Sequence, residues 1–253
     1  MIPKIIHFCW FGRGKYPELV NMCIESWKRV LPDYEIKLWD EESFDVNICN
    51  FTKMAYEKKR WAFVSDFARL FALYQYGGVY MDTDMEVLKD FSIMLKEDKY
   101  VSSFLEGGFL SACFIACPAK NAFIERLLNY YTDRMWTFND FEIMNPIIFS
   151  KIAKRDFDIS IGKEYCFNDQ FAIYPAEYFA PYKKSIFGEG MKRFQHRKYR
   201  ITDNTFVVHH EMGSWGKSST ISKIIRGMLR LIVPYRWYNY LKRKRAIRLI
   251  SEI

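Results

Sequence analysis

Two aspartates, Asp82 and Asp84, stand two positions apart in an otherwise apolar segment, residues 79–88. Side chains at this spacing on a strand point to the same side, and two neighbouring carboxylates repel each other unless a cation lies between them. Carboxylate oxygens are hard ligands that suit Mn²⁺ or Mg²⁺, and these ions also bind phosphate oxygens. The segment therefore predicts a strand that carries a site for a divalent metal and a phosphorylated ligand.

A second charged pair, Asp66 and Arg69, has the i, i+3 spacing of one helix face. Residues 61–73 around it are apolar on nearly every side, so we expect the pair to be at least partly buried. A buried aspartate and arginine facing the carboxylate strand could bind ribose or sugar hydroxyls. A surface salt bridge is the alternative.

The run 206–216 begins as a short apolar strand and ends in polar side chains. Two adjacent histidines at a strand end, with a remote pair of aspartates, favour metal binding. A tryptophan in the same run is suited to cover a sugar or a nucleotide. The candidates for a third metal ligand and for this cover are His209, His210, Glu211, Ser214 and Trp215.

The elements that must position these residues predict an α/β domain. A buried strand, a helix that begins at a proline and an alternating second strand form the β-α-β opening of a doubly wound sheet. A long helix then ends at two glycines, Gly77 and Gly78, directly before the carboxylate strand. The expected ranges are strands at 2–11 and 34–39, and helices at 17–30, at about 53–76 and at 120–131.

Length and composition fit one catalytic domain with a modest appendage. The chain has 253 residues, of which 50% are hydrophobic, and its six cysteines have neither zinc-ligand spacing nor the density of a disulfide scaffold. Reduced thiols in a cytoplasmic protein are the simplest interpretation. We find no signal peptide and no apolar run of 18 residues, so we expect no membrane span and no export.

The charge is concentrated at the end of the chain. Residues 217–253 hold ten Lys or Arg residues and one Glu, a net charge of +9, which leaves −1 of the total +8 for residues 1–216. Within this tail, apolar residues recur at helical spacing and the basic residues lie off their stripe. The apolar stripe consists of Ile221, Ile224, Ile225, Met228, Leu229 and Ile232.

This pattern predicts a basic amphipathic helical tail that lies on an anionic membrane surface. We expect a catalytic domain at 1–216, a tail at 217–253, and a cytoplasmic enzyme held peripherally at the inner face of the membrane. The alternatives for the stripe are packing against the body or against a second copy, as in a homodimer. Nucleic-acid binding is disfavoured, because an Ile/Leu/Met stripe suits a lipid interface better.

Taken together, these motifs resemble the glycosyltransferase family 32 group, whose members are described as capsular polysaccharide synthesis or mannosyltransferase proteins and are related to the clostridial glucosylating toxins. The likeness covers residues 1 to about 216 and is weaker between about 121 and 205. It rests on four runs: Ile2-Pro-Lys-Ile-Ile-His7 with Trp10, Ser65-Asp66-x-x-Arg69, Tyr76-Gly-Gly-x-Tyr-x-Asp82-x-Asp84, and a terminal His with Ser214-Trp215.

The resemblance implies a GT-A fold, a divalent metal and a nucleotide-sugar donor, with a UDP-hexose favoured and GDP-mannose as the alternative. Phe8 and Trp10 would bind the nucleotide, with Trp10 stacked on the base. Asp66 and Arg69 would hold the donor sugar. Asp82 would contact ribose and metal.

Further metal and phosphate contacts are also implied by resemblance. Asp84 would ligate the metal directly, Glu211 or Ser214 would complete its shell, and Trp215 would meet the diphosphate. In the glycogenin-like enzymes a His-x-x-Gly run supplies a metal ligand, and His210-Glu-Met-Gly213 is similar to it. The two likenesses disagree on the third ligand, so His210 and Glu211 both remain candidates.

The expected reaction is transfer of a hexose, with retention, to a glycan or lipid-linked oligosaccharide acceptor in capsular polysaccharide synthesis. Retention needs a carboxylate nucleophile or a same-face attack, and Glu106, Asp140 and Asp169 are the carboxylates far enough along the chain to reach such a site. A phosphohydrolase of the haloacid dehalogenase type is the rival enzyme, but its downstream Gly-Asp acidic segment is missing. A non-catalytic binding module is the other alternative.

Overall fold

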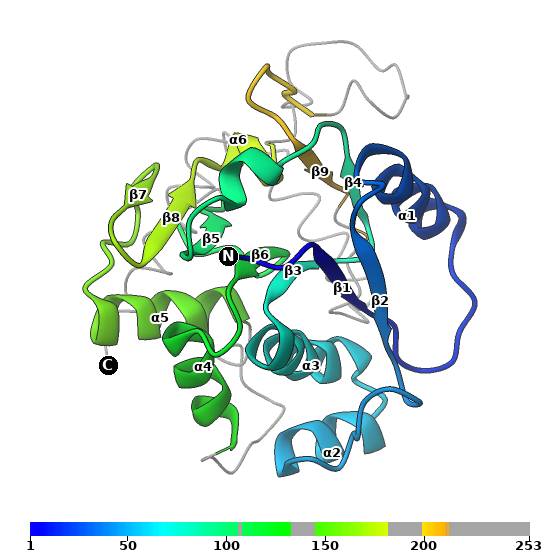
Figure 1. Ribbon diagram of the computed structural model, residues 1–253. Coiled ribbons are helices and arrows are strands. Elements are labelled where there is room, and N and C mark those ends of the chain that lie inside the picture. Colours follow the sequence, from blue (N-terminus) through cyan, green and yellow to red (C-terminus); the bar gives the residue numbers. More distant parts are fainter. Residues whose placement is uncertain (106–107, 133–144, 182–198, 211, 213–253) are drawn as a thin grey trace, which may run out of the picture.

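The centre of the molecule is a seven-stranded mixed sheet with helices on both faces (Figure 1). The computed structural model describes residues 1–105, 108–132, 145–181, 199–210 and 212. The strand order is β2-β1-β3-β6-β5-β8-β7, and β4 and β9 form a separate two-stranded sheet. The predicted α/β class with a mixed, helix-flanked sheet is confirmed, whereas the predicted tail at 217–253 lies outside the described residues.

The opening β-α-β unit has nearly the predicted bounds. Strand β1 (Ile5–Cys9) is followed by α1 (Glu18–Val30) and by β2 (Glu35–Trp39), which is parallel to β1. Helix α1 starts after Pro17 and has an acidic residue in its first turn and basic residues in its last turn, as the helix dipole favours.

The single helix predicted at about 53–76 is wrong, because the chain forms two helices, α2 (Asn50–Glu57) and α3 (Trp61–Tyr76). Lys59 between them has a left-handed φ of 54°, which ends α2 without glycine or proline. Helix α3 ends as predicted at Gly77 and Gly78, which have φ values of 64° and 96°. A Cβ atom on Gly78 would lie 2.7 Å from the Ile5 carbonyl oxygen, so only glycine lets the chain turn this close to β1.

The prediction that residues 79–88 form one strand carrying both aspartates is also wrong in detail. The chain forms β3 (Gly78–Met81) in the main sheet and β4 (Met85–Val87) in the small one, where β4 pairs with β9 (Val207–His209). Asp82 and Asp84 lie in the turn between them, closed by a hydrogen bond from the Met85 amide to the Asp82 carbonyl. The turn, rather than the two-residue period of a strand, therefore sets where the two carboxylates point.

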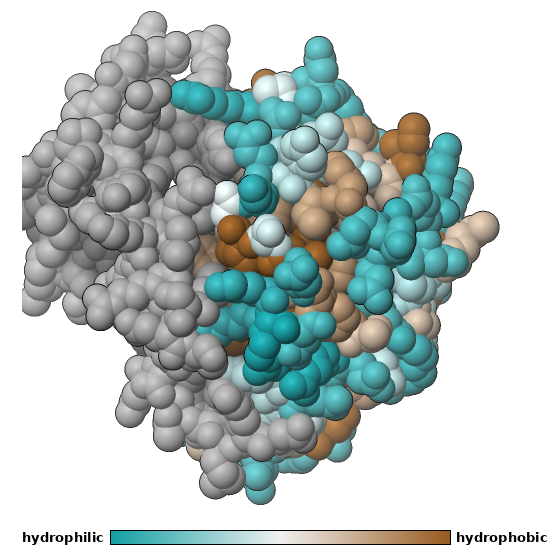
Figure 2. Space-filling model, turned by 90° about the vertical axis from the view of Figure 1, so that its left-hand side faces the viewer, coloured by the Kyte–Doolittle hydropathy of each residue, from teal (hydrophilic) through white to brown (hydrophobic). Residues whose placement is uncertain are grey.

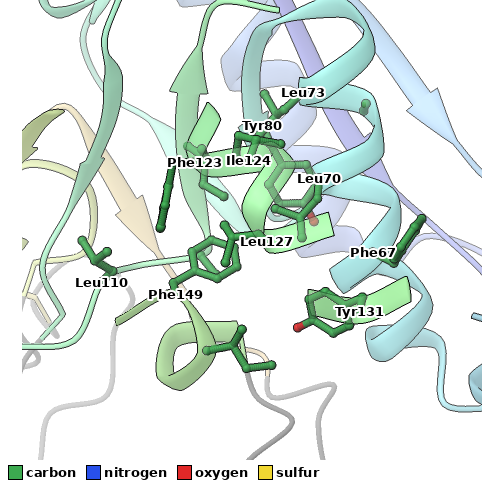
Figure 3. Packing of buried hydrophobic residues seen from close by; sticks show 14 of the residues in the cluster. Phe67, Leu70, Leu73, Tyr80, Leu110, Phe123, Ile124, Leu127, Tyr131 and Phe149 are labelled. Carbon is green, nitrogen blue, oxygen red and sulfur yellow. The ribbon is translucent and has the colours of Figure 1, made fainter. Parts of the chain in front are cut away.

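Alternate side chains of the strands pack into two hydrophobic layers, one on each face of the sheet. Ile6, Val79 and Met81 pack with α1 on one face, while Tyr80 packs with α3 on the other. Figure 3 shows this second layer, where side chains of α3, α4 and α5 meet over the sheet. The elements that complete the fold are β5 (Tyr100–Ser103), β6 (Phe114–Cys117), α4 (Ala122–Thr132), α5 (Asn145–Phe157), β7 (Cys166–Phe167), β8 (Phe171–Tyr174) and α6 (Ala176–Phe179), with a 3₁₀ turn at Ser92–Leu95.

Strand direction decides which loops can meet. β1, β2, β3, β5 and β8 run in one direction and β6 and β7 in the other, so five strands end at one edge of the sheet, called here the carboxyl edge. Trp10, Asp40 and Asp82 follow β1, β2 and β3 at this edge. In open α/β sheets this edge is where ligands bind.

The opposite end of the strand order, at β7, lies on the side of the molecule seen in Figure 2. Hydrophobic atoms gather near the centre of that view and hydrophilic side chains surround them.

All six cysteines are free thiols. No helix among the described residues combines the length and the apolar character needed to cross a membrane.

Candidate metal and sugar site

Three side chains from two distant segments form a cluster at the carboxyl edge. Asp82, Asp84 and His209 each offer a ligand atom, and these atoms all lie within 4.8 Å of one another. The Nε2 atom of His209 is 3.2 Å from Oδ1 of Asp84, and the amide of Met212 donates to Oδ2 of Asp84 at 2.7 Å. Strand β9 brings His209 here because its register on β4 sets His209 opposite Met85.

The two aspartates differ in their electrostatics. Burial raises the pKa of Asp82, and neighbouring Asp84 adds to this, against the opposing effects of Arg69 and His209. Burial also raises the pKa of Asp84, but the hydrogen bond and charge of His209 and the Met212 amide outweigh it, and the pKa falls below its ordinary value. A divalent cation at the cluster would offset both the burial of Asp82 and the repulsion between the carboxylates.

The donor set of this cluster fits a metal of the manganese or magnesium type. It consists of two carboxylates and one imidazole, a mixture of oxygen and nitrogen ligands that suits Mn²⁺ better than Ca²⁺. Asp82, Asp84 and His209 would hold the ion.

Arg69 links this cluster to a buried acid on its own helix. Its guanidinium is 3.1 Å from the Asp66 carboxylate and 3.3 Å from the Asp82 carboxylate, and it donates to the Ala112 carbonyl at 2.6 Å. The central carbon of its guanidinium lies over the Tyr80 ring, 4.5 Å from the ring centre. The predicted Asp66–Arg69 pair is therefore buried and adjacent to Asp82, and the alternative of a surface salt bridge is wrong.

Asp66 is held by a hydrogen bond from α5 that the sequence did not predict. Asn145, the first residue of α5, donates to Oδ1 of Asp66 at 2.8 Å, and the Tyr131 hydroxyl donates in turn to Asn145. Oδ2 of Asp66 has no hydrogen-bond partner among the described residues, although the side chain is fully buried. Burial raises the pKa of Asp66 well above its usual range. This buried oxygen therefore has hydrogen-bonding capacity that the described residues leave unused.

Of the two residues predicted to bind the nucleotide, only Trp10 is accessible. Trp10 is half-buried at the mouth of a cavity, and its indole N–H donates to the Gly14 carbonyl at 2.7 Å. Phe8 is only 5% exposed and packs edge-on against Trp27, in the core layer that contains α1. The alternating position of Phe8 on β1 turns its side chain into the core, and its contact with a nucleotide stays a prediction.

His210 is turned away from the cluster. Its Nε2 atom lies 3.1 Å from Oε2 of Glu86, and its ring packs edge-on against Tyr199. Only its backbone amide reaches the site, where it donates to the Asp84 carbonyl at 2.9 Å. Neighbouring side chains at the end of β9 point to opposite sides, so the structure places the imidazole of His209, and not that of His210, beside Asp84.

Asp169 lies at the opposite edge of the sheet from Asp82. It is exposed in the turn from β7 to β8, directly before β8 begins, and the neighbouring Gln170 carbonyl accepts a hydrogen bond from the amide that opens β5. Asp82 follows the end of β3, which runs in the same direction as β8. The length of a strand therefore separates Asp169 from the edge where Asp82 lies, and its catalytic role stays a prediction.

Several predicted residues lie outside the described part of the chain: Glu106, Asp140, Glu211, Ser214 and Trp215. The sequence also gave no reason to assign a role to Asn145, because no local pattern marks this residue and its contact with Asp66 forms only in the folded chain. His209 was within the motif, and knowledge of the β4–β9 register would have selected it.

Comparison with known proteins agrees with this geometry. A family model described as "Glycosyltransferase sugar-binding region containing DXD motif" matches residues 17–101. Inositol phosphoceramide mannosyltransferase 1 from Schizosaccharomyces pombe is 30% identical over 140 residues, which are 51% of this chain and 42% of the relative. Inositol phosphoceramide mannosyltransferase 3 from the same organism is 35% identical over 92 residues, 33% of this chain and 24% of the relative.

The matches thus cover less than half of the length of either curated relative. Among solved structures, the PaToxG glycosyltransferase superposes with a TM-score of 0.49 at 18% identity, over 62% of this chain and 70% of that one. The family match includes Asp66, Arg69, Asp82 and Asp84, the residues that the fold brings together. Residues 17–101 are therefore similar to a glycosyltransferase sugar-binding region that contains a DXD motif.

Proposed function

We propose that this chain is a metal-dependent glycosyltransferase of the GT-A type that transfers a hexose from a nucleotide-diphosphate sugar. The observation that carries the proposal is the adjacency of the Asp82–Asp84–His209 cluster to the buried Asp66–Arg69 pair. One group suits a metal and a diphosphate, and the other suits sugar hydroxyls. Their meeting at the carboxyl edge matches the two halves of a nucleotide sugar.

The chemistry follows from where charge develops. As the anomeric carbon loses its bond to phosphate, negative charge grows on the diphosphate, and a divalent cation held by Asp82, Asp84 and His209 would stabilise it. Arg69 contributes a second fixed positive charge, because its contacts to Asp66, Asp82 and Ala112 hold the guanidinium in one position.

Asp66 and Trp10 have separate binding roles in this proposal. Oδ2 of Asp66 forms a hydrogen bond with a donor-sugar hydroxyl, which would pair a buried oxygen that otherwise has no partner among the described residues. The Trp10 indole offers a flat face to the nucleotide at the mouth of its cavity. The sugar is thus oriented by the helix α3 pair and the nucleotide by the end of β1.

The transferred sugar and its acceptor are proposed from the relatives. Both curated matches are named inositol phosphoceramide mannosyltransferases, which makes mannose the first sugar to test and an inositol-containing lipid the first acceptor. We further propose transfer with retention, a role in capsular polysaccharide synthesis, and a location at the inner membrane surface through the tail at 217–253.

A donor screen tests the proposal. The full chain is incubated with GDP-mannose, UDP-glucose, UDP-galactose and UDP-N-acetylglucosamine, and released nucleotide is measured with Mn²⁺, with EDTA, and with Mn²⁺ restored. We expect release from one donor, loss in EDTA and recovery with Mn²⁺. Asp84→Asn should remove this activity, while Asp33→Asn, an exposed carboxylate paired with Lys4, should keep it. Hydrolysis of an aryl phosphate without any donor activity would instead favour the phosphohydrolase.

A further inference from the structure

A cavity of about 430 Å³ opens at the carboxyl ends of β1 and β2, beside Trp10. Its volume is in the range of small-molecule sites. Trp10, Tyr16 and Leu38 supply flat and apolar walls, and the Trp10 and Tyr16 rings meet edge-on with 5.0 Å between their centres. The remaining lining residues are Arg13, Gly14, Lys15, Asp40, Glu41 and Glu42.

The cavity lining contains three carboxylates, Asp40, Glu41 and Glu42, which differ in the hydrogen bonds that they already make. Oδ1 of Asp40 accepts from the Glu42 and Ser43 amides, so Asp40 closes its own turn. Oε1 of Glu41 accepts from the Gly12 amide at 2.7 Å and from the Tyr56 hydroxyl at 3.1 Å. The Glu42 carboxylate makes no hydrogen bond or ion pair with the described part of the chain and has both oxygens free for a ligand.

The charge of the lining decides which part of a nucleotide sugar belongs here. Three carboxylates stand against the two cations Arg13 and Lys15, so a diphosphate would be repelled and is better placed at the Asp82–Asp84–His209 cluster. A neutral, flat group that carries N–H donors suits the cavity. Stacking against an indole and donation to a carboxylate are both properties of a nucleobase.

We propose that this cavity takes the base of the donor nucleotide and that Glu42 selects guanine over uracil, an inference that rests on the proposed function. Guanine carries two adjacent donors, N1–H and N2–H, which match the two acceptor oxygens of one carboxylate. Uracil carries one donor, N3–H, between two carbonyl acceptors, so the second carboxylate oxygen would face a carbonyl. Arg13 and Lys15 supply donors for the O6 and N7 acceptors of guanine.

This assignment replaces the UDP-hexose that the sequence resemblance favours with a GDP-sugar. Adenine and cytosine do not compete, because each sets a ring-nitrogen acceptor beside its amino donor on that edge. Glu42→Gln gives a discriminating variant, since a carboxamide offers one acceptor and one donor. That arrangement fits the N3–H and O4 atoms of uracil and opposes one of the two guanine donors.

The experiment is calorimetric titration of the full chain with GDP, IDP and UDP in the presence of Mn²⁺. We expect GDP to bind at least ~10-fold more tightly than UDP, since one charge-assisted hydrogen bond is worth about a factor of ten or more. IDP, which lacks the N2 amino group, should fall between them. Glu42→Gln should weaken GDP and strengthen UDP, whereas Glu35→Gln, an exposed glutamate at the other end of β2, should leave the ratio unchanged.

Two results overturn the assignment. UDP binding that equals or exceeds GDP binding in the unaltered chain contradicts guanine selection, and an unchanged GDP preference in Glu42→Gln contradicts the role of Glu42. If UDP is preferred while Mn²⁺-dependent release of nucleotide persists, only this inference fails. If no diphosphate binds at all, the proposed function fails with it.

Discussion

The imidazole of His209 and the carboxylate of Asp84 lie 3.2 Å apart, between Nε2 and Oδ1, although β9 and β4 are far apart in the sequence. The remaining cluster member, Asp82, follows the main-sheet strand β3. The ligand set therefore exists only in the folded chain. A metal that binds the folded chain and not the unfolded one also raises the free energy of unfolding.

Replacing Asp84 by asparagine should reduce the rate of sugar transfer more than 100-fold at saturating donor. The low pKa of Asp84 keeps this carboxylate charged at neutral pH, and the loss of a charged ligand removes roughly 3 kcal/mol of stabilisation from the leaving diphosphate. Steady-state kinetics with Mn²⁺ measures the loss. Glu86→Gln, which alters a carboxylate two residues away that contacts His210, should retain most of the activity.

Arg69→Lys should destabilise the chain by about 3 kcal/mol, because one ammonium group cannot pair at once with the buried Asp66, the partly buried Asp82 and a carbonyl. Urea denaturation followed by circular dichroism gives the free energy of unfolding. Arg155→Lys is the matched control, since Arg155 is exposed and pairs with Asp156 at the surface. If Arg69→Lys lowers the free energy of unfolding no more than Arg155→Lys does, the buried network is contradicted.

Stability should fall as the pH drops from about 6.5 to about 4, partly through His7. Burial is the main reason that the pKa of His7 falls to about 4, and its ring accepts from the Trp39 indole while facing the Gly77 carbonyl. The unfolded chain binds the proton at higher pH than the folded chain, so this contribution, about 3 kcal/mol, is present above pH 6.5 and lost through pH 4. Thermal unfolding of His7→Gln should show a flatter pH profile over this window.

The sequence predicted the α/β class, the first β-α-β unit and the cap at Gly77–Gly78, because each has a local signal such as alternation, a proline or a glycine pair. It also brought Asp66, Arg69, Asp82 and Asp84 together through motif spacing. The turn at Asp82–Asp84 was hidden, since apolar residues continue on both sides of it. The break at Lys59 was hidden too, because neither glycine nor proline marks it.

Two placements at the site depend on long-range strand pairing. The position of His209 beside Asp84 depends on the register of β9 against β4, and the distance of Asp169 from Asp82 depends on the direction of β8 relative to β3. Neither is encoded in the local pattern. Asn145 reaches Asp66 only because α5 packs beside α4 and α3.

The tail at 217–253, which lies outside the described residues, should bind membranes through its apolar stripe and its basic side chains together. The full chain is expected to float with anionic liposomes at low salt and to remain in solution with neutral ones. Ile225→Asp and Arg226→Glu should each release it. A chain ending at Gly216 that floats as well as the full chain, or that fails to fold, would show that the stripe is not a membrane-binding surface.

The most direct test of the Asp82–Asp84–His209 cluster is pulsed electron paramagnetic resonance of Mn²⁺ bound to the full chain with a nucleoside diphosphate. Nitrogen modulation from a coordinated imidazole reports the histidine ligand itself. We expect this modulation in the unaltered chain and in His210→Ala, whose imidazole contacts Glu86, and its loss in His209→Ala. Modulation that persists in His209→Ala, or that disappears in His210→Ala, would contradict the site described here.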